Sequence, residues 1–315
     1  MIEVRHVTKS FGSRLAVDDL SFSVQPGQVT GFLGPNGAGK STTMKMILGL
    51  TRPTSGAIRV LGKSPGEIDR PLTSIGGLLD SSWVHPNRSA RAHLRWMAAY
   101  SQIPYSQVVD VLNQTGLTPV ADLRAGKFSL GMKQRLGLAG ALLGNPKVLV
   151  LDEPLNGLDP EGIGWMKETL QALAHQGKTI LLSSHLLAEI SSTCEHLIVI
   201  GRGKLVADSS VKDFVAGSGA HRVRVRAENL ALISAELRAR HFDFSESDDA
   251  LGRPMLEIER SDSDSVGRAV AGSGVTLLEL TEVAATLETA FMESTRDQVE
   301  FGTAVVSASR AEGAE

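Results

Sequence analysis

The beginning of the chain reads as short strands separated by turn residues. Apolar and β-branched residues recur in short runs, which Gly12, Pro26-Gly27 and residues 53–56 interrupt. The runs cover residues 1–8, 20–24, 29–33 and 57–61. We therefore expect a strand-rich N-terminal part, in part an antiparallel sheet.

Helical spacing begins near residue 89 and continues to about residue 143. The apolar residues of two faces lie three or four positions apart, as in Leu94, Met97 and Ala98 on one and Val108, Val111 and Leu112 on another. We expect a helical subdomain at about residues 86–143. After it, the apolar runs 147–151 and 179–183 flank a helical segment, 160–175, with Asp159 at the capping position and Pro160 at the first helical position. Strand, helix and strand in this order predict a parallel sheet.

A second, smaller unit follows the glycine-rich residues 216–220. Strands are predicted at 221–227, 242–246, 254–259 and 275–281, and helices at 230–240 and 265–271. This βαββαβ order predicts a small α+β domain, with one more helix at 283–294. The expected division is 1–216 for the large domain and 217–296 for the small one. Residues 297–315, rich in Ala, Ser, Gly and Glu, are expected to be a disordered tail.

Composition and charge limit the kinds of partner. A chain of 315 residues with 42% apolar and 21% charged residues is typical of a globular protein with two domains. The net charge is -3 and no basic run stands out, so nucleic acid is not an expected partner. The single cysteine, Cys194, and an N-terminus without the apolar core of a secretion signal favour the cytoplasm. The apolar stretches are shorter than the roughly 20 residues that cross a bilayer, so we expect any membrane role to depend on a partner.

Residues 34–42, Gly-Pro-Asn-Gly-Ala-Gly-Lys-Ser-Thr, have the spacing of a P-loop. A buried-type strand precedes them and an apolar-faced helix follows. Glycines let backbone N–H groups surround phosphates, the helix N-terminus adds a positive dipole end, and Lys40 can reach the β and γ phosphates. The expected ligands are ATP and Mg²⁺, with Ser41 bound to the metal. The predicted nucleotide-binding residues are Asn36, Gly37, Gly39, Lys40, Ser41 and Thr42.

Two adjacent carboxylates close the apolar run 148–151. Asp152 and Glu153 then lie at the C-terminal end of a predicted parallel strand, where α/β sheets collect ligands. Asp152 is predicted to hold Mg²⁺ directly or through water. Glu153 is predicted to orient or deprotonate the water that attacks the phosphate.

The order of motifs resembles an ABC-type ATPase cassette over about residues 1–216. Phe-Ser-Leu-Gly-Met-Lys-Gln-Arg at 128–135 follows the P-loop, and Val-Leu-Val-Leu-Asp-Glu-Pro, then Asn156 to Asp159, and His185 after the next strand complete the series. The resemblance implies an α/β fold: a P-loop NTPase cassette with a parallel core sheet, an N-terminal antiparallel β part and a helical subdomain, carrying a small C-terminal α+β domain.

The resemblance also assigns roles to single residues. Phe11 matches the aromatic that stacks on adenine, the alternative being a core residue. Ser129 and Gly131 match the signature that binds ATP held by another subunit, which implies a homodimer of cassettes; alone, Ser129 reads as a helix cap. His185 matches the catalytic switch histidine that contacts the γ-phosphate, although a lone histidine is commonly structural. Asp159 matches a loop that crosses the dimer interface as well as it fits a cap.

Two positions depart from the family pattern. Asp80 stands where the cassette usually has glutamine, so we predict an anionic Mg²⁺ ligand there. Leu130 replaces a glycine of the signature, which makes close approach of that backbone to a phosphate less favourable.

The signature's form is similar to that of the branch serving antibiotic and peptide exporters and resistance systems. Residues 286–291, Thr-Leu-Glu-Thr-Ala-Phe, are a second match, the alternative being an ordinary amphipathic helix. The resemblance implies an ATPase that powers a drug, antibiotic or peptide exporter from the cytoplasmic face of the membrane, with the permease on a separate chain. The region around Trp83, His85 and Trp96 either docks the permease or packs internally.

Two alternative functions stay open at this point. One is a soluble ABC-type ATPase that is not coupled to transport. The other is a weakly hydrolysing, ATP-gated resistance factor, which the departures at Asp80 and Leu130 favour.

Overall fold

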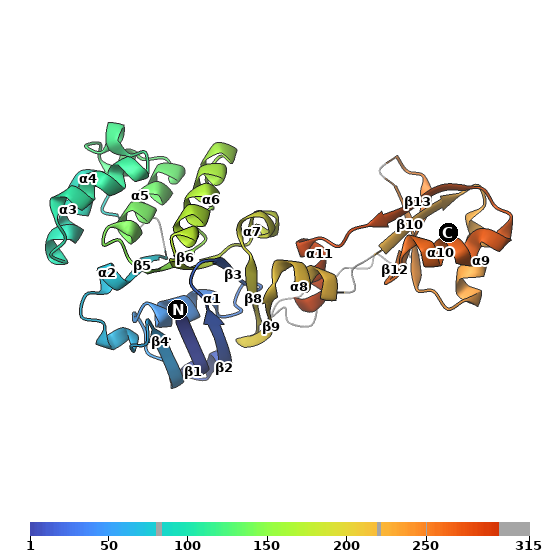
Figure 1. The fold of residues 1–315 in the computed structure, drawn as a ribbon, viewed down its shortest axis with the longest axis horizontal. Coiled ribbons are helices and arrows are strands. Elements are labelled where there is room, and N and C mark those ends of the chain that lie inside the picture. Colours follow the sequence, from blue (N-terminus) through green and yellow to red (C-terminus); the bar gives the residue numbers. More distant parts are fainter. Residues whose placement is uncertain (80–83, 219–221, 250, 296–315) are drawn as a thin grey trace, which may run out of the picture.

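A six-stranded sheet forms the centre of the large part of the molecule (Figure 1). The computed structural model describes residues 1–79, 84–218, 222–249 and 251–295. The sheet has the order β5-β6-β7-β3-β8-β9, parallel except for β9, which confirms the predicted parallel core. Its strands are β3 (Val29–Leu33), β5 (Ile75–Leu78), β6 (Val148–Asp152), β7 (Thr179–Ser183), β8 (His196–Gly201) and β9 (Lys204–Ser210).

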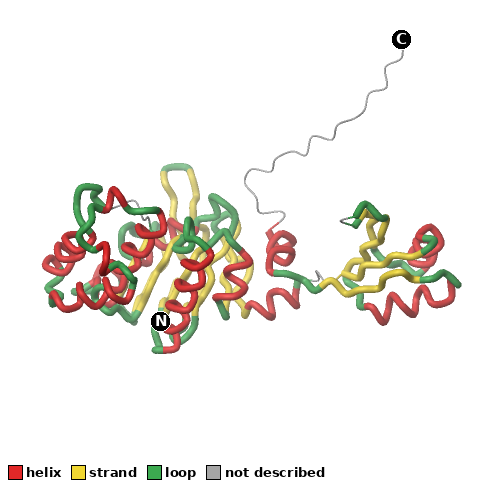
Figure 2. The backbone as a smooth tube through the Cα atoms, turned by 90° about the horizontal axis from the view of Figure 1, so that it is seen from above, coloured by secondary structure: helices red, strands yellow, loops and turns green. Residues whose placement is uncertain are grey.

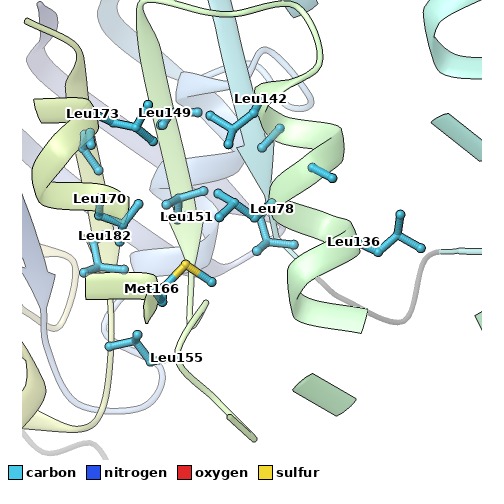
Figure 3. Close-up of a cluster of buried hydrophobic side chains, with 14 of the residues drawn as sticks. Leu78, Leu136, Leu142, Leu149, Leu151, Leu155, Met166, Leu170, Leu173 and Leu182 are labelled. Carbon is cyan, nitrogen blue, oxygen red and sulfur yellow. The ribbon is translucent and has the colours of Figure 1, made fainter. Parts of the chain in front are cut away.

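Both faces of this sheet are covered, which explains its nearly continuous apolar strands. Along β6, Leu149 and Leu151 belong to one core cluster, whereas Val148 and Val150 belong to the other. Figure 3 shows Leu149 and Leu151 between leucines of two helices, α5 (Leu130–Leu142) and α6 (Pro160–His175). Successive apolar side chains of β6 therefore pack against the two covering layers in turn.

The second face carries the N-terminal antiparallel sheet, as predicted. Its order is β2-β1-β4, and α1 lies in the same core cluster. The bounds are β1 (Ile2–Phe11), β2 (Arg14–Val24), β4 (Ser55–Val60) and α1 (Lys40–Ile47). β1 and β2 extend further than predicted because they form one hairpin, which turns at Gly12 with a positive φ of 59°.

Helices gather beside β5 and β6 at one end of the sheet (Figure 1). They are α2 (Pro71–Ser74), α3 (Ala90–Tyr100), α4 (Tyr105–Gln114) and α5. Three long helices begin at capping side chains: Ser89 for α3, Ser129 for α5 and Asp159 for α6 each accept a backbone N–H bond of 2.9 to 3.2 Å. The predicted helical subdomain is therefore present, and side-chain caps fix the N-termini of α3 and α5.

A hairpin and two short helices between residues 187 and 217 were not predicted. They are α7 (Leu187–Thr193), β8, β9 and α8 (Val211–Gly217). β9 is a partly exposed edge strand, so its sequence lacks a clear apolar alternation. The hairpin turn reaches the loop between β3 and α1, because Gly203 N–H donates to the Ala38 carbonyl. It also contacts β2, where Asp18 N–H donates to the Gly203 carbonyl.

The C-terminal part forms a separate four-stranded antiparallel sheet in the order β11-β12-β10-β13. Its chain order is β10 (Arg222–Ala227), α9 (Leu230–Ala239), β11 (Phe244–Asp248), β12 (Pro254–Glu259), α10 (Ser263–Val270) and β13 (Leu277–Val283), which is the predicted βαββαβ series. A core cluster of its own joins the sheet to both helices, with Val225, Ile233 and Val266 fully buried. In Figure 2 its strands lie apart from the strands of the large sheet.

The last described helix, α11 (Leu287–Thr295), packs on the large part rather than on the small sheet. Leu287 and Ala290 belong to the large core cluster and are 2% and 0% exposed. The expected division at residue 217 would have grouped this helix with the small sheet. The expected tail, residues 297–315, lies outside the described residues.

This packing predicts different outcomes for two deletions. Replacing residues 222–283 with a short glycine-serine linker, which keeps α11, should leave the melting temperature of the large part nearly unchanged. Ending the chain after Gly217 should cost roughly 2 to 3 kcal/mol of unfolding free energy, because the apolar contacts of Leu287 with the large core are removed. Thermal and denaturant unfolding of the two variants measures this, and equal stabilities would contradict it.

Candidate nucleotide-binding site

The loop between β3 and α1 has a backbone that requires glycine. Gly37 and Gly39 have φ values of 83° and 103°, in the left-handed region. A Cβ atom on Gly39 would lie 2.5 Å from the Ala16 carbonyl oxygen. Gly39 is also the N-cap of α1, so the loop feeds directly into the positive end of that helix. This arrangement provides backbone groups for an anion.

Lys40, the first residue of α1, reaches back over this loop. Its Nζ donates to the Gly34 carbonyl at 2.6 Å and to the Pro35 carbonyl at 3.2 Å. Burial lowers the pKa of Lys40, and the nearby carboxylates of Glu153 and Asp152 act in the opposite direction. A partly desolvated cation therefore faces two carboxylates across the loop.

Asp152 lies at the end of β6 and accepts hydrogen bonds from two hydroxyls. Ser41 Oγ donates to Oδ2 at 2.7 Å, and Ser183 Oγ, from the end of β7, donates to Oδ1. The structure thus brings together two of the three predicted metal ligands, Ser41 and Asp152. The third, Asp80, lies outside the described residues.

Glu153 is held in an unusual backbone conformation by its neighbours. Its φ is 52°, which is uncommon for a residue other than glycine. Its N–H donates to Ser183 Oγ at 3.0 Å, and its carbonyl accepts from Gln134 Nε2 at 3.4 Å. Gln134 Nε2 also lies 3.2 Å from the Asn156 carbonyl, so one buried amide links the segment around Glu153 to α5.

His185, just after β7, contacts the Glu153 carboxylate twice. Its Nδ1 lies 2.6 Å from Glu153 Oε2, and its backbone N–H donates to the same oxygen at 3.2 Å. Residues 32 positions apart in the sequence therefore meet because β6 and β7 are neighbours in register. The two predicted catalytic side chains form one pair.

A cavity of about 810 Å³ lies over the loop. Every nucleotide-binding residue predicted from the P-loop lines it, and so does Phe11, whose exposed fraction of 54% excludes a core position. The residues are Phe11, Arg14, Leu15, Ala16, Asn36, Gly37, Ala38, Gly39, Lys40, Ser41, Thr42, Leu79, Asp152, Glu153 and Arg202. Lys9 Nζ lies 4.9 Å from the centre of the Phe11 ring at the mouth of this cavity.

Ser129 and Gly131 lie elsewhere, at the N-terminus of α5. They are absent from the lining of the cavity, and Ser129 is exposed while it caps the helix. Leu130, which departs from the family pattern, packs on Gly157, where a Cβ atom would overlap its side chain. Asp159 caps α6 through Gly162 N–H at 2.9 Å.

Four polar residues of the site were not predicted from the sequence. Ser183 and Gln134 hold the segment of Asp152 and Glu153, and Arg14 and Arg202 line the cavity. Ser183 ends a predicted parallel strand, and Gln134 is a polar residue on a largely apolar helix. Both features are weak sequence indications of a role in the site. Arg202 had none, because it reaches the cavity through the unpredicted hairpin of β8 and β9.

Comparison with known proteins agrees with this geometry. Residues 17–156 match the family model described as ABC transporter. Residues 221–288 match a model described as a domain of unknown function. None of the helices within the described ranges is long and apolar enough to cross a membrane.

Curated relatives and a solved structure are similar to about two thirds of the chain. The chain is 44% identical over 214 residues to the bacitracin transport ATP-binding protein of Bacillus licheniformis, covering 66% of this chain and 69% of that protein. It is 36% identical over 208 residues to a lantibiotic transport ATP-binding protein of Streptococcus pyogenes, covering 66% and 90%. The solved structure of an ATP-binding subunit of an ABC transporter matches with a TM-score of 0.63 and 28% identity, covering 70% of this chain and 93% of that one. The chain therefore belongs to the ABC transporter family and is an ATP-binding cassette that hydrolyses ATP.

Proposed function

We propose that the chain is the ATP-hydrolysing subunit of an exporter for a drug, antibiotic or peptide, with the permease on a separate chain. The observation that carries this proposal is the likeness to ATP-binding proteins of bacitracin and lantibiotic transport, over 214 and 208 residues. The chain would then act at the cytoplasmic face of the membrane, held there by the permease.

In this proposal the phosphates of ATP lie on the loop between β3 and α1. Backbone groups of Gly37 and Gly39, the N-terminus of α1 and Lys40 face the β and γ phosphates. Phe11, at the exposed mouth of the same cavity, stacks on the adenine ring. Asn36 and Thr42 complete the lining of the phosphate end.

The oxygen donors of Ser41 and Asp152 fit Mg²⁺. One hydroxyl and one carboxylate, already 2.7 Å apart, leave further positions for phosphate oxygens and water, which is the usual pattern for this ion. When bound, the metal neutralises charge that develops on the phosphates. Ser183 keeps the Asp152 carboxylate oriented toward this position. Asp80 is proposed as an additional anionic ligand.

Glu153 and His185 are proposed to act on the attacking water and the γ-phosphate. The Glu153 carboxylate orients the water or accepts its proton, and His185 contacts the γ-phosphate. Their 2.6 Å contact keeps both groups at one edge of the sheet. Ser183 and Gln134 are positioning residues, because they fix the backbone of Glu153 from two sides.

We further propose that two copies bind ATP between them. Ser129 and Gly131 lie at the exposed N-terminus of α5 and outside the cavity of their own chain. Such a helix start favours an anion, and a second copy can bring one to it. The homodimer would therefore hold each ATP between the loop of one cassette and the signature of the other.

The exposed aromatic side of α3 is the proposed docking surface for the permease. Trp96 and Tyr100 are exposed and stacked with ring centres 6.3 Å apart, and the Arg88 guanidinium lies 5.2 Å from the Trp96 ring. Exposed aromatic residues beside arginine are typical of protein interfaces. His85 is close in sequence, and Trp83, also named for this surface, lies outside the described residues.

Replacing Lys40 with Ala should abolish tight ATP binding. The change removes the cation that faces the β and γ phosphates, and we expect at least about a 100-fold loss of affinity or turnover. Nucleotide titration and a steady-state ATPase assay measure the two effects. Lys45→Ala is the matched control, because Lys45 is exposed one turn later on α1. Wild-type turnover of the Lys40→Ala variant would refute the assignment of the loop.

Replacing Glu153 with Gln should separate binding from hydrolysis. The side chain keeps its shape but loses the carboxylate, so ATP should still bind while turnover falls by orders of magnitude. A dimer should then accumulate, because cleavage no longer reverses closure. Size-exclusion chromatography with ATP and Mg²⁺ checks this. A variant that binds ATP but stays monomeric would count against the two-copy arrangement.

Affinity purification from detergent-solubilised membranes tests the role in export. The full chain should retain a polytopic membrane protein, and a Trp96→Ser, Tyr100→Ser double variant should lose it. Leu278→Ser, at another exposed apolar residue on β13, is the control and should retain it. Robust ATP turnover without any membrane partner would favour the soluble ATPase. Negligible turnover despite ATP binding would favour a weakly hydrolysing factor.

A further inference from the structure

α11 is the element of the C-terminal part that touches the large core. It packs against α7 and α8, far along the chain from the strands that carry the site (Figure 1). Leu287 and Ala290 are buried in the large core cluster, and Phe291 packs against it. The outer side of the helix is solvated, with Met292 68% exposed. α11 therefore uses one apolar side to hold α7 and α8.

α7 begins two residues after His185. Its N-cap is Leu186, whose N–H donates to Ser184 Oγ at 3.0 Å. A cavity of about 290 Å³ between the two elements is lined by His185 and the next four residues on one side and by Glu288 of α11 on the other. α11 thus lies directly beside the segment that carries the His185 ring.

A helix as short as α7 depends on its neighbours for its position. It has seven residues, well below the length at which a helix is stable alone. One support comes from α6, where Lys167 Nζ lies 2.7 Å from Ser192 Oγ and 3.5 Å from the Glu189 carboxylate. The side chains of Lys167 and Glu189 are both partly solvent-exposed, and such ion pairs contribute little to stability. The apolar support comes from the large core cluster, to which Leu287 and Ala290 of α11 belong together with Ile190 of α7.

A displacement of α7, which begins two residues after His185, would move His185 relative to Glu153. A displacement of about 1 Å in a catalytic group can lower a rate by about 100-fold. β13 of the small sheet ends at Val283 and α11 begins at Leu287, so a three-residue connection, 284–286, links the small sheet to α11, which packs on α7. Movement of the small sheet would therefore act on the segment that holds His185.

We propose that α11, through Leu287, is a positioning element for His185, and that the small C-terminal sheet acts through it on the rate of ATP hydrolysis rather than on ATP binding. The nucleotide cavity itself is lined by no residue beyond Arg202 among the described residues. Because α11 contributes no residue to this lining, a change in α11 should alter kcat and leave ATP affinity nearly unchanged.

The test uses the full chain with three substitutions on α11. Leu287→Ala should lower kcat about 10-fold or more, while KM and the Kd for ATP change less than about twofold. Leu287→Met conserves the buried volume and should restore most of the rate. Met292→Ala, on the solvated side, should behave as wild type. Circular dichroism establishes that each variant is folded.

A direct readout of His185 completes the test. Its ring signals in the NMR spectrum of ¹⁵N-histidine-labelled protein are assigned by their loss in His185→Ala. They should shift in Leu287→Ala and remain unchanged in Met292→Ala. If Leu287→Ala does not fold, Glu288→Ala, which alters the cavity beside His185, takes its place. The proposal is overturned if the folded variant keeps its kcat and its His185 signals, or if ATP affinity and kcat fall together.

Discussion

The rest of the site depends on the two hydrogen bonds that the Asp152 carboxylate accepts. One comes from the hydroxyl of Ser41, on the helix that follows β3, and the other from the hydroxyl of Ser183, at the end of β7. β6, β7 and β3 are consecutive neighbours in the sheet, and Asp152 is directly opposite Ser183 in the parallel register. A shift of one residue in that register would turn these side chains to the other face. The apolar faces of the strands therefore fix the positions of the polar residues that follow them.

The same sheet explains which parts were predictable from the sequence. Val29–Leu33, Thr179–Ser183 and Pro160–His175 coincide with their predictions, because an apolar run or a cap with a following proline marks each end locally. β9 and α7 were not predicted, because many of their residues are partly exposed and contacts with distant segments stabilise their regular structure. The place of α11 likewise depends on burial against α7 and α8, which a glycine-rich boundary at residue 217 does not report.

The residues of the site were likewise predicted only in part. The P-loop residues, Asp152, Glu153 and His185 belong to recognisable motifs, and the structure places them around one edge of the sheet. Ser183 and Gln134 act through register and packing, so their contribution became visible only with the tertiary contacts. Ser129 and Gly131 lie outside the cavity of their own chain, and their proposed role requires a second copy. Local sequence thus predicted the residues that line the cavity better than the residues that hold them in position.

We propose that Asp152 organises the metal and the phosphate loop for hydrolysis. The most direct measurement is the steady-state ATPase rate of Asp152→Asn as a function of Mg²⁺ concentration. Asn keeps the size of the side chain but removes the charge, so the maximal rate should fall by about 100-fold, and half-saturation should need at least about 10-fold more Mg²⁺. Asp110→Asn, at an exposed position on α4, should leave both values unchanged. A folded Asp152→Asn variant with the wild-type rate and the wild-type Mg²⁺ dependence would contradict the account.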